Sequence, residues 1–511
     1  MTMTHPGLPL WWGIGVLIFM LIASFWLLTA KAPNGKTNRV INVIHLPLIG
    51  ALLKKLIAQP WVLLSLKGIM VIFFLTVIVA GLVGTPIAER NFATLLTWNL
   101  WWAGLIFSIF FLGTAWCAIC PWDALAQWLV RRRLWRRAEP NNSLNLRVPR
   151  ILKSIWPALF MFIGLTWLEL GLGVTSNPQA TALLALLMVV LATVSLAVFK
   201  RKAFCRYFCP IGRTIGAYSQ LAAVELRPIN TQTCVDCKTL ECYHGNEQID
   251  PCPTSLVMGS LKQNSYCTSC GNCVQSCPED NIAWRLRNPV IEARETARPH
   301  WDEAWFMIGL LALTAFHGLT MLPFWEQWMF SLARIMGDSG QMVMSFSLGL
   351  VASMVVVAAF YALSIAMTQR FFMPTLRFKG SFSAFAFVAL PLAFSYHMAH
   401  NLNHLIRESG GVWAVIINPL GIDTLPLSMA EKHQRHMDMW LSQETLYTLQ
   451  ALLIMIGFMV ALQIIRHRAT ALWKDAPRHR WNLQLLPIMC FAIGMSAFHL
   501  WMLMQPMTMR M

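Results

Sequence analysis

The chain has 511 residues, of which 57% are hydrophobic and only 12% are charged. This composition excludes a soluble globular protein and indicates a polytopic membrane protein. A net charge of +17 would suggest nucleic-acid binding in a soluble protein. Because no nucleic-acid motif is present, we interpret the charge as basic loops on one side of a bilayer.

Five apolar runs long enough to span a bilayer precede the cysteine-rich part of the chain. They cover residues 11–30, 63–83, 95–115, 155–174 and 182–199. The first run could be a signal peptide, but an uncharged segment precedes it and no small-residue cleavage site follows, so we predict a retained helix. Residues 41–57 contain Pro47, Lys54 and Lys55 and predict an interfacial segment instead of a span.

Two of these runs end in a pair of cysteines followed by proline. The third run ends in Cys-Ala-Ile-Cys-Pro from residue 117, and the fifth leads into Cys-Arg-Tyr-Phe-Cys-Pro from residue 205. Small apolar residues beside helix-stopping prolines would explain one such pair. Two pairs at matching depth favour a metal site or a redox-active thiol set. The members of this additional centre would be Cys117, Cys120, Cys205 and Cys209.

Eight of the thirteen cysteines lie between Cys234 and Cys277. The second half of this segment has the bacterial ferredoxin spacing Cys-x2-Cys-x2-Cys-x3-Cys-Pro, in which three thiolates hold one 4Fe-4S cluster and the fourth reaches a second cluster. A more stretched run upstream also ends in Cys-Pro, so the spacing predicts two clusters. The predicted ligands of the first are Cys252, Cys267, Cys270 and Cys273, and those of the second are Cys234, Cys237, Cys242 and Cys277.

Zinc and disulfides are the alternatives for these eight cysteines. Structural zinc sites usually combine two Cys-x2-Cys pairs and give no reason for a proline after the last cysteine of each run. Disulfides are rare in a reducing cytoplasm, so this alternative depends on the side of the membrane on which the segment lies.

Five further apolar runs follow the cysteine segment, at residues 305–322, 342–367, 382–400, 446–465 and 485–502. Every second loop between the ten runs is basic, as expected when positive charge stays in the cytoplasm. The sequence therefore predicts an all-α polytopic membrane protein of about ten transmembrane helices, with both termini outside and an inserted cytoplasmic ferredoxin domain. The predicted parts are an N-terminal membrane region (1–199), the ferredoxin-like domain with two clusters (200–297) and a C-terminal membrane region (298–511).

Five histidines lie toward the predicted outer face of the second helix set. The eighth run ends with three of them at i, i+3 and i+7 on one helical face, and the sixth and tenth runs each carry the triplet Ala-Phe-His. Polar groups inside a membrane are costly and usually functional. Paired imidazoles suit haem b, and histidine with nearby methionines suits copper, whereas simple packing at the interface is the alternative. The candidate metal ligands are His317, His397, His400, His404 and His499, and the loop residues His433 and His436 could join a copper site.

The cysteine-proline helix ends, followed by a double-cluster segment, resemble the membrane-bound 4Fe-4S polyferredoxins typified by the NapH, NosR and CcoG proteins. The resemblance covers about residues 95–290, although the family pattern has Cys-x3-Cys-Pro twice and the first copy here is one residue short. It implies electron transfer at the cytoplasmic membrane of a bacterium, often serving a respiratory reductase or metalloenzyme maturation. Nothing in the chain is long enough for the flavin domain of NosR-type members, and the last five helices are not part of the short NapH pattern.

Two functions fit these residues. We predict a membrane-bound iron-sulfur electron-transfer protein that moves electrons between cytoplasmic 4Fe-4S clusters and a membrane or extracytoplasmic partner, such as a haem, a quinone or a respiratory or maturation protein. The alternative is a copper-handling or metal-reducing membrane protein that uses the clusters as its electron source. Membrane lipid and a redox partner are expected to bind, and nucleic acid is not. No catalytic group is evident, so any enzymatic role would be that of an oxidoreductase component.

Overall fold

The computed structural model describes residues 4–29, 40–47, 50–134, 142–372, 377–472 and 482–508. Most of these residues are helical, which confirms the predicted all-α polytopic class. Some of the basic loop residues used to predict the orientation, within 31–39, 136–137 and 474–480, lie outside the described residues.

Eight stretches of the described chain are long and apolar enough to cross a membrane, judged by length and composition. Five are single helices, namely α1 (Leu10–Thr29), α3 (Pro60–Val83), α8 (Pro178–Val198), α15 (Val343–Phe371) and α20 (Gln443–Leu472). The others are built from consecutive pieces: α4 (Phe92–Thr94), η3 (Leu95–Trp101) and α5 (Trp102–Leu112); α16 (Phe378–Phe385), η11 (Ala386–Val388) and α17 (Ala389–Arg407); η13 (Leu483–Leu485) and α21 (Leu486–Met504).

Two further predicted spans are bent or short. α13 (Trp301–Leu319) and α14 (Pro323–Met336) pass the same test together but meet at an angle of 96°. The bend falls where Pro323 opens α14, because proline lacks the N–H that would continue the helical hydrogen bonds. α7 (Trp156–Gly171) is apolar but has 16 residues. The eight stretches, the bent pair and α7 correspond to the ten predicted helices.

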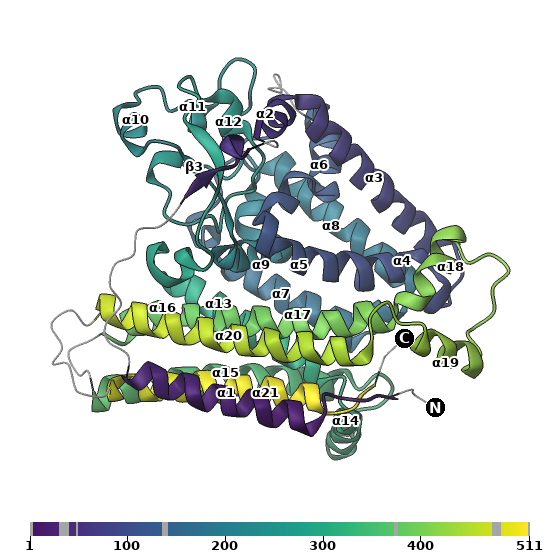
Figure 1. Ribbon diagram of the computed structural model, residues 1–511. Coiled ribbons are helices and arrows are strands. Elements are labelled where there is room, and N and C mark those ends of the chain that lie inside the picture. The colour runs from purple at the N-terminus through teal and green to yellow at the C-terminus, as the bar shows by residue number, and fades with distance from the viewer. Residues whose placement is uncertain are drawn as a thin grey trace.

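The long helices pack side by side around α17 (Figure 1). In the stretch that contains α17, 94% of the most apolar 18-residue segment is buried inside the protein. The corresponding share for α3 is 22%. A helix that is apolar all round and enclosed by others forms the core, whereas α3 exposes its apolar side chains as a lipid-facing helix would. α17 therefore holds the three histidines of its C-terminal half inside the protein.

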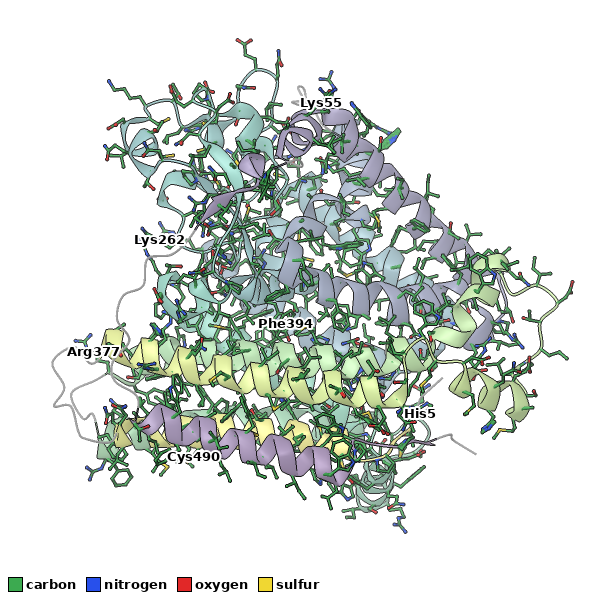
Figure 2. All side chains as sticks on the ribbon, viewed as in Figure 1. His5, Lys55, Lys262, Arg377, Phe394 and Cys490 are labelled. Carbon is green, nitrogen blue, oxygen red and sulfur yellow. The ribbon has the colours of Figure 1, made fainter. Side chains whose placement is uncertain are left out.

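The two ends of the bundle differ. At one end, called the cysteine end, lie the short helices α10 (Thr231–Asp236), α11 (Glu241–His244) and α12 (Asn272–Ser276) (Figure 1). At the other, called the histidine end, β1 (Thr4–His5) pairs with β5 (Met507–Thr508). Figure 2 shows Lys262 and Arg377 toward the cysteine end and His5 toward the histidine end. Both described ends of the chain therefore lie on one side, close to α18 (Val412–Ile417) and α19 (Met429–Met437).

A three-stranded antiparallel sheet supports the cysteine segment. Its order is β2 (Ile41–Asn42), β4 (Ile282–Leu286) and β3 (Val224–Pro228), with Ile41 opposite Leu286 and Leu226 opposite Trp284. The region predicted as one interfacial segment, residues 41–57, thus begins with a strand of this sheet. A 3-10 turn (Val43–His45) and α2 (Gly50–Ala58) follow it.

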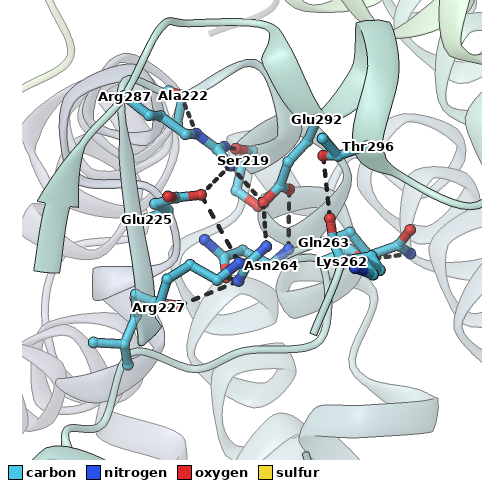
Figure 3. Close-up of polar contacts among 12 residues, drawn as sticks. Ser219, Ala222, Glu225, Arg227, Lys262, Gln263, Asn264, Arg287, Glu292 and Thr296 are labelled. Atoms are coloured by element: carbon cyan, nitrogen blue, oxygen red, sulfur yellow. Dashed lines mark hydrogen bonds and ion pairs between the residues drawn. The ribbon is translucent and has the colours of Figure 1, made fainter. Parts of the chain in front are cut away.

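A buried ion-pair network fastens the sheet to the bundle (Figure 3). Glu292 pairs with Arg227 at 2.7 Å and also with Arg287, and it accepts a hydrogen bond from the backbone N–H of Asn264 at 2.9 Å. From α20, Arg468 donates to the carbonyl of Ala293 at 2.9 Å, next to Glu292 in the chain. Charges removed from water are stable only when fully paired, so this network fixes the cysteine segment in one position.

Glu292→Gln is expected to lower the free energy of unfolding by about 3–5 kcal/mol, because it removes one of the two carboxylates, Glu292 and Glu225, that pair with two buried guanidinium groups. The Glu292 side chain is 1% exposed and the Arg287 side chain 0%. The matched control is Glu295→Gln, whose carboxylate is 38% exposed and should contribute no more than about 1 kcal/mol. The thermal unfolding midpoint of both purified variants in detergent checks this difference, and equal shifts would contradict it.

Candidate iron-sulfur centres

Four cysteines of the inserted segment surround one small cavity. Cys252, Cys267, Cys270 and Cys273 line this cavity, and apolar side chains such as Leu226 help to close it. These are the four residues predicted as ligands of the first cluster. Cysteines from two distant runs thus meet at one place, as the ferredoxin spacing requires.

The backbone around this cavity is shaped to point N–H groups at sulfur. Gly271, with φ of +79°, turns the loop between two of the cysteines in a conformation that favours glycine. The N–H of Leu256 donates to Cys252 Sγ at 3.3 Å, and that of Ser269 donates to Cys267 Sγ at 3.4 Å. Such bonds stabilise a thiolate and tune the potential of a cluster that it holds.

The donor set fits a cluster better than a single ion. Burial raises the pKa of Cys267 to about 12, so a positively charged group is needed to keep this thiol deprotonated at neutral pH. Across the described residues, no three His, Cys, Asp or Glu side chains lie close enough together to hold one metal ion. Zinc would draw its sulfurs in to bonds of about 2.3 Å. Four cysteines that line one cavity instead match the number of thiolates that hold a 4Fe-4S cluster.

The second predicted set lies nearer to solvent. Burial raises the pKa of the Cys242 thiol, and negative charge on three neighbouring thiols raises it further. Those neighbours are Cys234, Cys237 and Cys277. The pKa of Cys237 is lowered because the backbone N–H of Leu240 donates to its sulfur. All four side chains are partly exposed, so a cluster here would be the more accessible of the two.

The two cysteine-proline helix ends converge at the cysteine end of the bundle. Cys117 lies in η4 (Ala115–Ala118) and Cys205 in the π-helix η7 (Phe204–Phe208). Burial, followed by charge on Cys209, raises the pKa of Cys117 to about 12. Burial also raises the pKa of Cys205, with smaller contributions from Cys209 and Cys120. The four helix-end cysteines therefore form one set, called the quartet.

Burial raises the pKa of all four quartet thiols above the ordinary value of cysteine. A protonated thiol neither ligates iron nor attacks a disulfide, so a positively charged group bound among these cysteines would be needed to hold them as thiolates.

Charge interactions and one hydrogen bond link the three sets in the order second set, first set, quartet. Negative charge on Cys242, from the second set, contributes to raising the pKa of Cys273 in the first, after burial and nearer thiols. Negative charge on Cys267 likewise contributes to the raised pKa of Cys117 in the quartet. The hydroxyl groups of Thr114 and Ser269 lie 2.7 Å apart across the same boundary. The exposed set, the buried set and the quartet thus follow one another toward the membrane helices.

An ion pair beside the quartet escaped the sequence analysis. Lys202 Nζ lies 2.6 Å from Asp123 Oδ2, and Cys205 Sγ lies 4.0 Å from Asp123 Oδ1. The sequence analysis assigned Lys202 only to a basic loop. The signal in the sequence was Asp123. It is an acidic residue in the first turn of α6 (Pro121–Arg131), a helix that begins at the proline of a cysteine-proline pair.

At the histidine end, the structure brings three of the five candidate histidines together. The rings of His317 and His400 lie 5.1 Å apart, and those of His400 and His404 lie 4.7 Å apart. Carboxylates close both ends of this row, because His317 Nδ1 lies 3.8 Å from Glu169 and His404 Nδ1 lies 3.3 Å from Glu408. The sequence analysis missed both carboxylates, although a single glutamate in an apolar run is a signal for function.

The other two candidates have tyrosine partners, although His397 lines the same small cavity as His317 and His400. His499 stacks on Tyr396 with ring centres 4.3 Å apart, and His397 places Nδ1 at 3.3 Å from the hydroxyl of Tyr218. The side chain of His436 and the whole of Met509 lie outside the described residues.

A haem does not fit between the two closest rings from different helices. Bis-histidine ligation needs a porphyrin plane between two imidazoles, whereas His317 and His400 are in direct edge-to-face contact. The described row also lacks three donors close enough to share one ion. Its geometry is that of a connected series of titratable groups.

Comparison with known proteins places an iron-sulfur domain at the quartet. A family model described as a 4Fe-4S binding domain matches residues 94–138 and 181–220. These two segments contain all four quartet cysteines, whereas the segment from Cys234 to Cys277 lies beyond them. The chain therefore carries a 4Fe-4S binding domain within a helical fold that has eight stretches able to span a membrane.

Two curated proteins resemble parts of the chain. The "Putative electron transport protein YccM" of Escherichia coli K12 is 30% identical over 118 residues, which is 22% of this chain and 30% of YccM. The "Uncharacterized protein MJ0750" of Methanocaldococcus jannaschii is 30% identical over 98 residues, or 19% of this chain and 37% of that protein. The chain thus matches less than two fifths of the length of either relative. No solved structure matches.

Proposed function

We propose that this protein is a membrane-bound iron-sulfur electron-transfer protein of the NapH, NosR and CcoG type, with two clusters in residues 200–297 and a third held by the quartet. The observation that carries the proposal is the convergence of both cysteine-proline helix ends inside the matched 4Fe-4S segments, next to the first cysteine set. The name of YccM, an electron transport protein, agrees with this function. A cluster at each set would accept and pass on one electron at a time.

The chain's own residues arrange a path from solvent to the membrane helices. The partly exposed second set offers the accessible entry, and the buried first set has N–H donors at two of its sulfurs. The quartet stands between these sets and the apolar bundle. Asp123 and Lys202 form an ion pair beside it.

We place the cysteine end in the cytoplasm of a bacterium and the histidine end on the outer side of its cytoplasmic membrane. The support is positive charge near the cysteine end, together with the alternation of basic loops along the sequence. Figure 2 shows Arg377 at this end, Arg131 pairs with Asp250, and Arg201 donates to the carbonyl of Cys252. The partners would be membrane lipid and a redox partner, either a protein or a quinone.

The experiment that tests this function is a metal and haem inventory of the protein purified without oxygen, with its reduced-minus-oxidised spectrum. Three sets of four cysteines predict about twelve irons and as many sulfides per chain. Iron near this value with reducible signals supports electron transfer. Stoichiometric zinc without iron would overturn it.

Copper handling is the second candidate. The described row does not bring three His, Cys, Asp or Glu donors to one point, so the observation in its favour is the pair of His317 and His400, with Met321 lining the adjoining cleft. The same inventory separates the two functions. Bound copper that is lost in His400→Ala, with iron unchanged, would favour the copper function, and iron alone would favour electron transfer.

A further inference from the structure

An apolar cavity lies inside the membrane-spanning part of the protein, directly beside the quartet. Its volume is about 340 Å³, and it is lined by side chains of α3, η3, α7 and α8. At its cysteine end the lining includes Trp116 and Pro121, which are adjacent in the chain to Cys117 and Cys120. A ligand in this cavity would therefore touch residues next to the quartet.

Tryptophan rings connect the two ends of this cavity. The ring of Trp101 lies 5.7 Å from that of Trp116, 5.9 Å from that of Trp122 and 5.9 Å from that of Trp102. Trp101 belongs to the π-helix η3, an irregular form that is frequent at functional sites. Large flat rings around an apolar space suit a flat aromatic or quinonoid ligand.

Glu169 lies where three cavities meet. With Trp102, it lines the apolar cavity, a small cavity that His317, His397 and His400 also line, and the cleft that opens at the histidine end. It is a single carboxyl group in the apolar helix α7, and such groups in membrane spans usually serve ions or protons. Glu169 is thus the polar end of an otherwise apolar site.

A series of titratable groups leads from Glu169 to the histidine end. His317 lies 3.8 Å from Glu169, and the row continues through His400 to His404, whose Nε2 atoms are 3.2 Å apart. Glu408 ends the row at 3.3 Å from His404, and both line the open cleft. Acidic and imidazole groups in such a row can pass protons along it.

We propose that the apolar cavity binds a lipid-soluble quinone and that Glu169, with the row from His317 to Glu408, exchanges its protons with the histidine end. The electrons come from the quartet, so this step rests on the proposed function. In reduction, one quinone takes two electrons, delivered singly, and two protons through Glu169, and it leaves as one quinol. In oxidation, the same electrons and protons move the opposite way. A lipid acyl chain could fill the cavity, but it would give neither the carboxyl group nor the imidazole row a role.

Binding is tested first, on the oxidised full-length protein in detergent, so that no electron transfer is needed. Decylubiquinone should bind saturably, one per chain, and Ala185→Trp should weaken binding at least about tenfold, because the new indole fills the cavity. The matched control is Leu187→Trp on the same helix, whose side chain is 45% exposed. Iron content confirms that both variants are folded. Equal competition by decanol, which has the tail without the ring, would overturn the proposal in favour of a lipid site.

Proton exchange is tested next with Glu169→Gln, which keeps the shape of the site. Decylubiquinone binding should change less than about twofold, while the rate of its reduction by the dithionite-reduced protein falls about 100-fold, as expected for loss of an acid-base group. The control is Glu326→Gln on α14, an exposed carboxylate outside the cavities. Equal rates in the two variants would overturn the role of Glu169. A wild-type protein that binds decylubiquinone but lacks iron would refute the proposed function and leave the binding site standing.

Discussion

Cys205→Ser is expected to abolish electron transfer from the reduced protein to decylubiquinone while the two clusters of the inserted segment persist. The reason is position, because the quartet separates the first cysteine set from the apolar cavity. Iron should fall by about four atoms per chain, since serine is a poor ligand for one cluster and the other eight cysteines are unchanged. Iron analysis and electron paramagnetic resonance of the reduced variant measure both effects.

The matched control is Cys490→Ser. Cys490 is the one cysteine outside the three sets, and its side chain is exposed on α21. This variant should keep full iron content and full electron transfer. If Cys205→Ser also keeps both, the quartet is structural and the third centre does not exist.

Paired substitutions should reveal which cysteines share a cluster. Cys270→Ala alone should remove one cluster, about four irons, and leave the remaining clusters in place. Cys252→Ser with Cys273→Ser should cost no more iron than either substitution alone, because both residues line one cavity. Cys242→Ser with Cys252→Ser should remove about eight irons, since these two cysteines lie in different sets.

The opposite result has a definite meaning. If the four cysteines of each run held their own cluster in chain order, Cys242 and Cys252 would share one cluster and Cys252 and Cys273 would not. The double variants would then exchange their iron contents. Iron and acid-labile sulfide per chain, measured for all variants in parallel, decide between the two pairings.

Local sequence patterns were enough to predict the helical class and the positions of the spans. Hydropathy acts over about twenty neighbouring residues, so α1, α15 and α20 follow from the chain itself. The ferredoxin spacing also predicted that Cys252 meets the cysteines of the second run, and it lines one cavity with Cys267, Cys270 and Cys273, whereas the assignment of all eight cysteines to two clusters stays a prediction. The short upstream strand was not, since Ile41 and Asn42 join β4 only through a contact between segments more than 200 residues apart in the chain.

The histidines show where sequence patterns cease to determine a site. His397 and His404 share a face of α17, but at about 1.5 Å per residue they lie about 10 Å apart along the helix and meet different neighbours. His397 meets Tyr218, whereas His404 meets His400 and Glu408. The matching Ala-Phe-His triplets predicted similar depth for His317 and His499, but only His317 joins the row.

The sequence by itself determined the apolar spans and the cysteine spacings, because both are set by residues close together in the chain. The tertiary structure decided which buried polar groups meet. Glu169 reaches His317, and Asp123 reaches Lys202, only because of the rotation and depth at which their helices pack. Those two quantities depend on side-chain packing between distant segments, which no local pattern encodes.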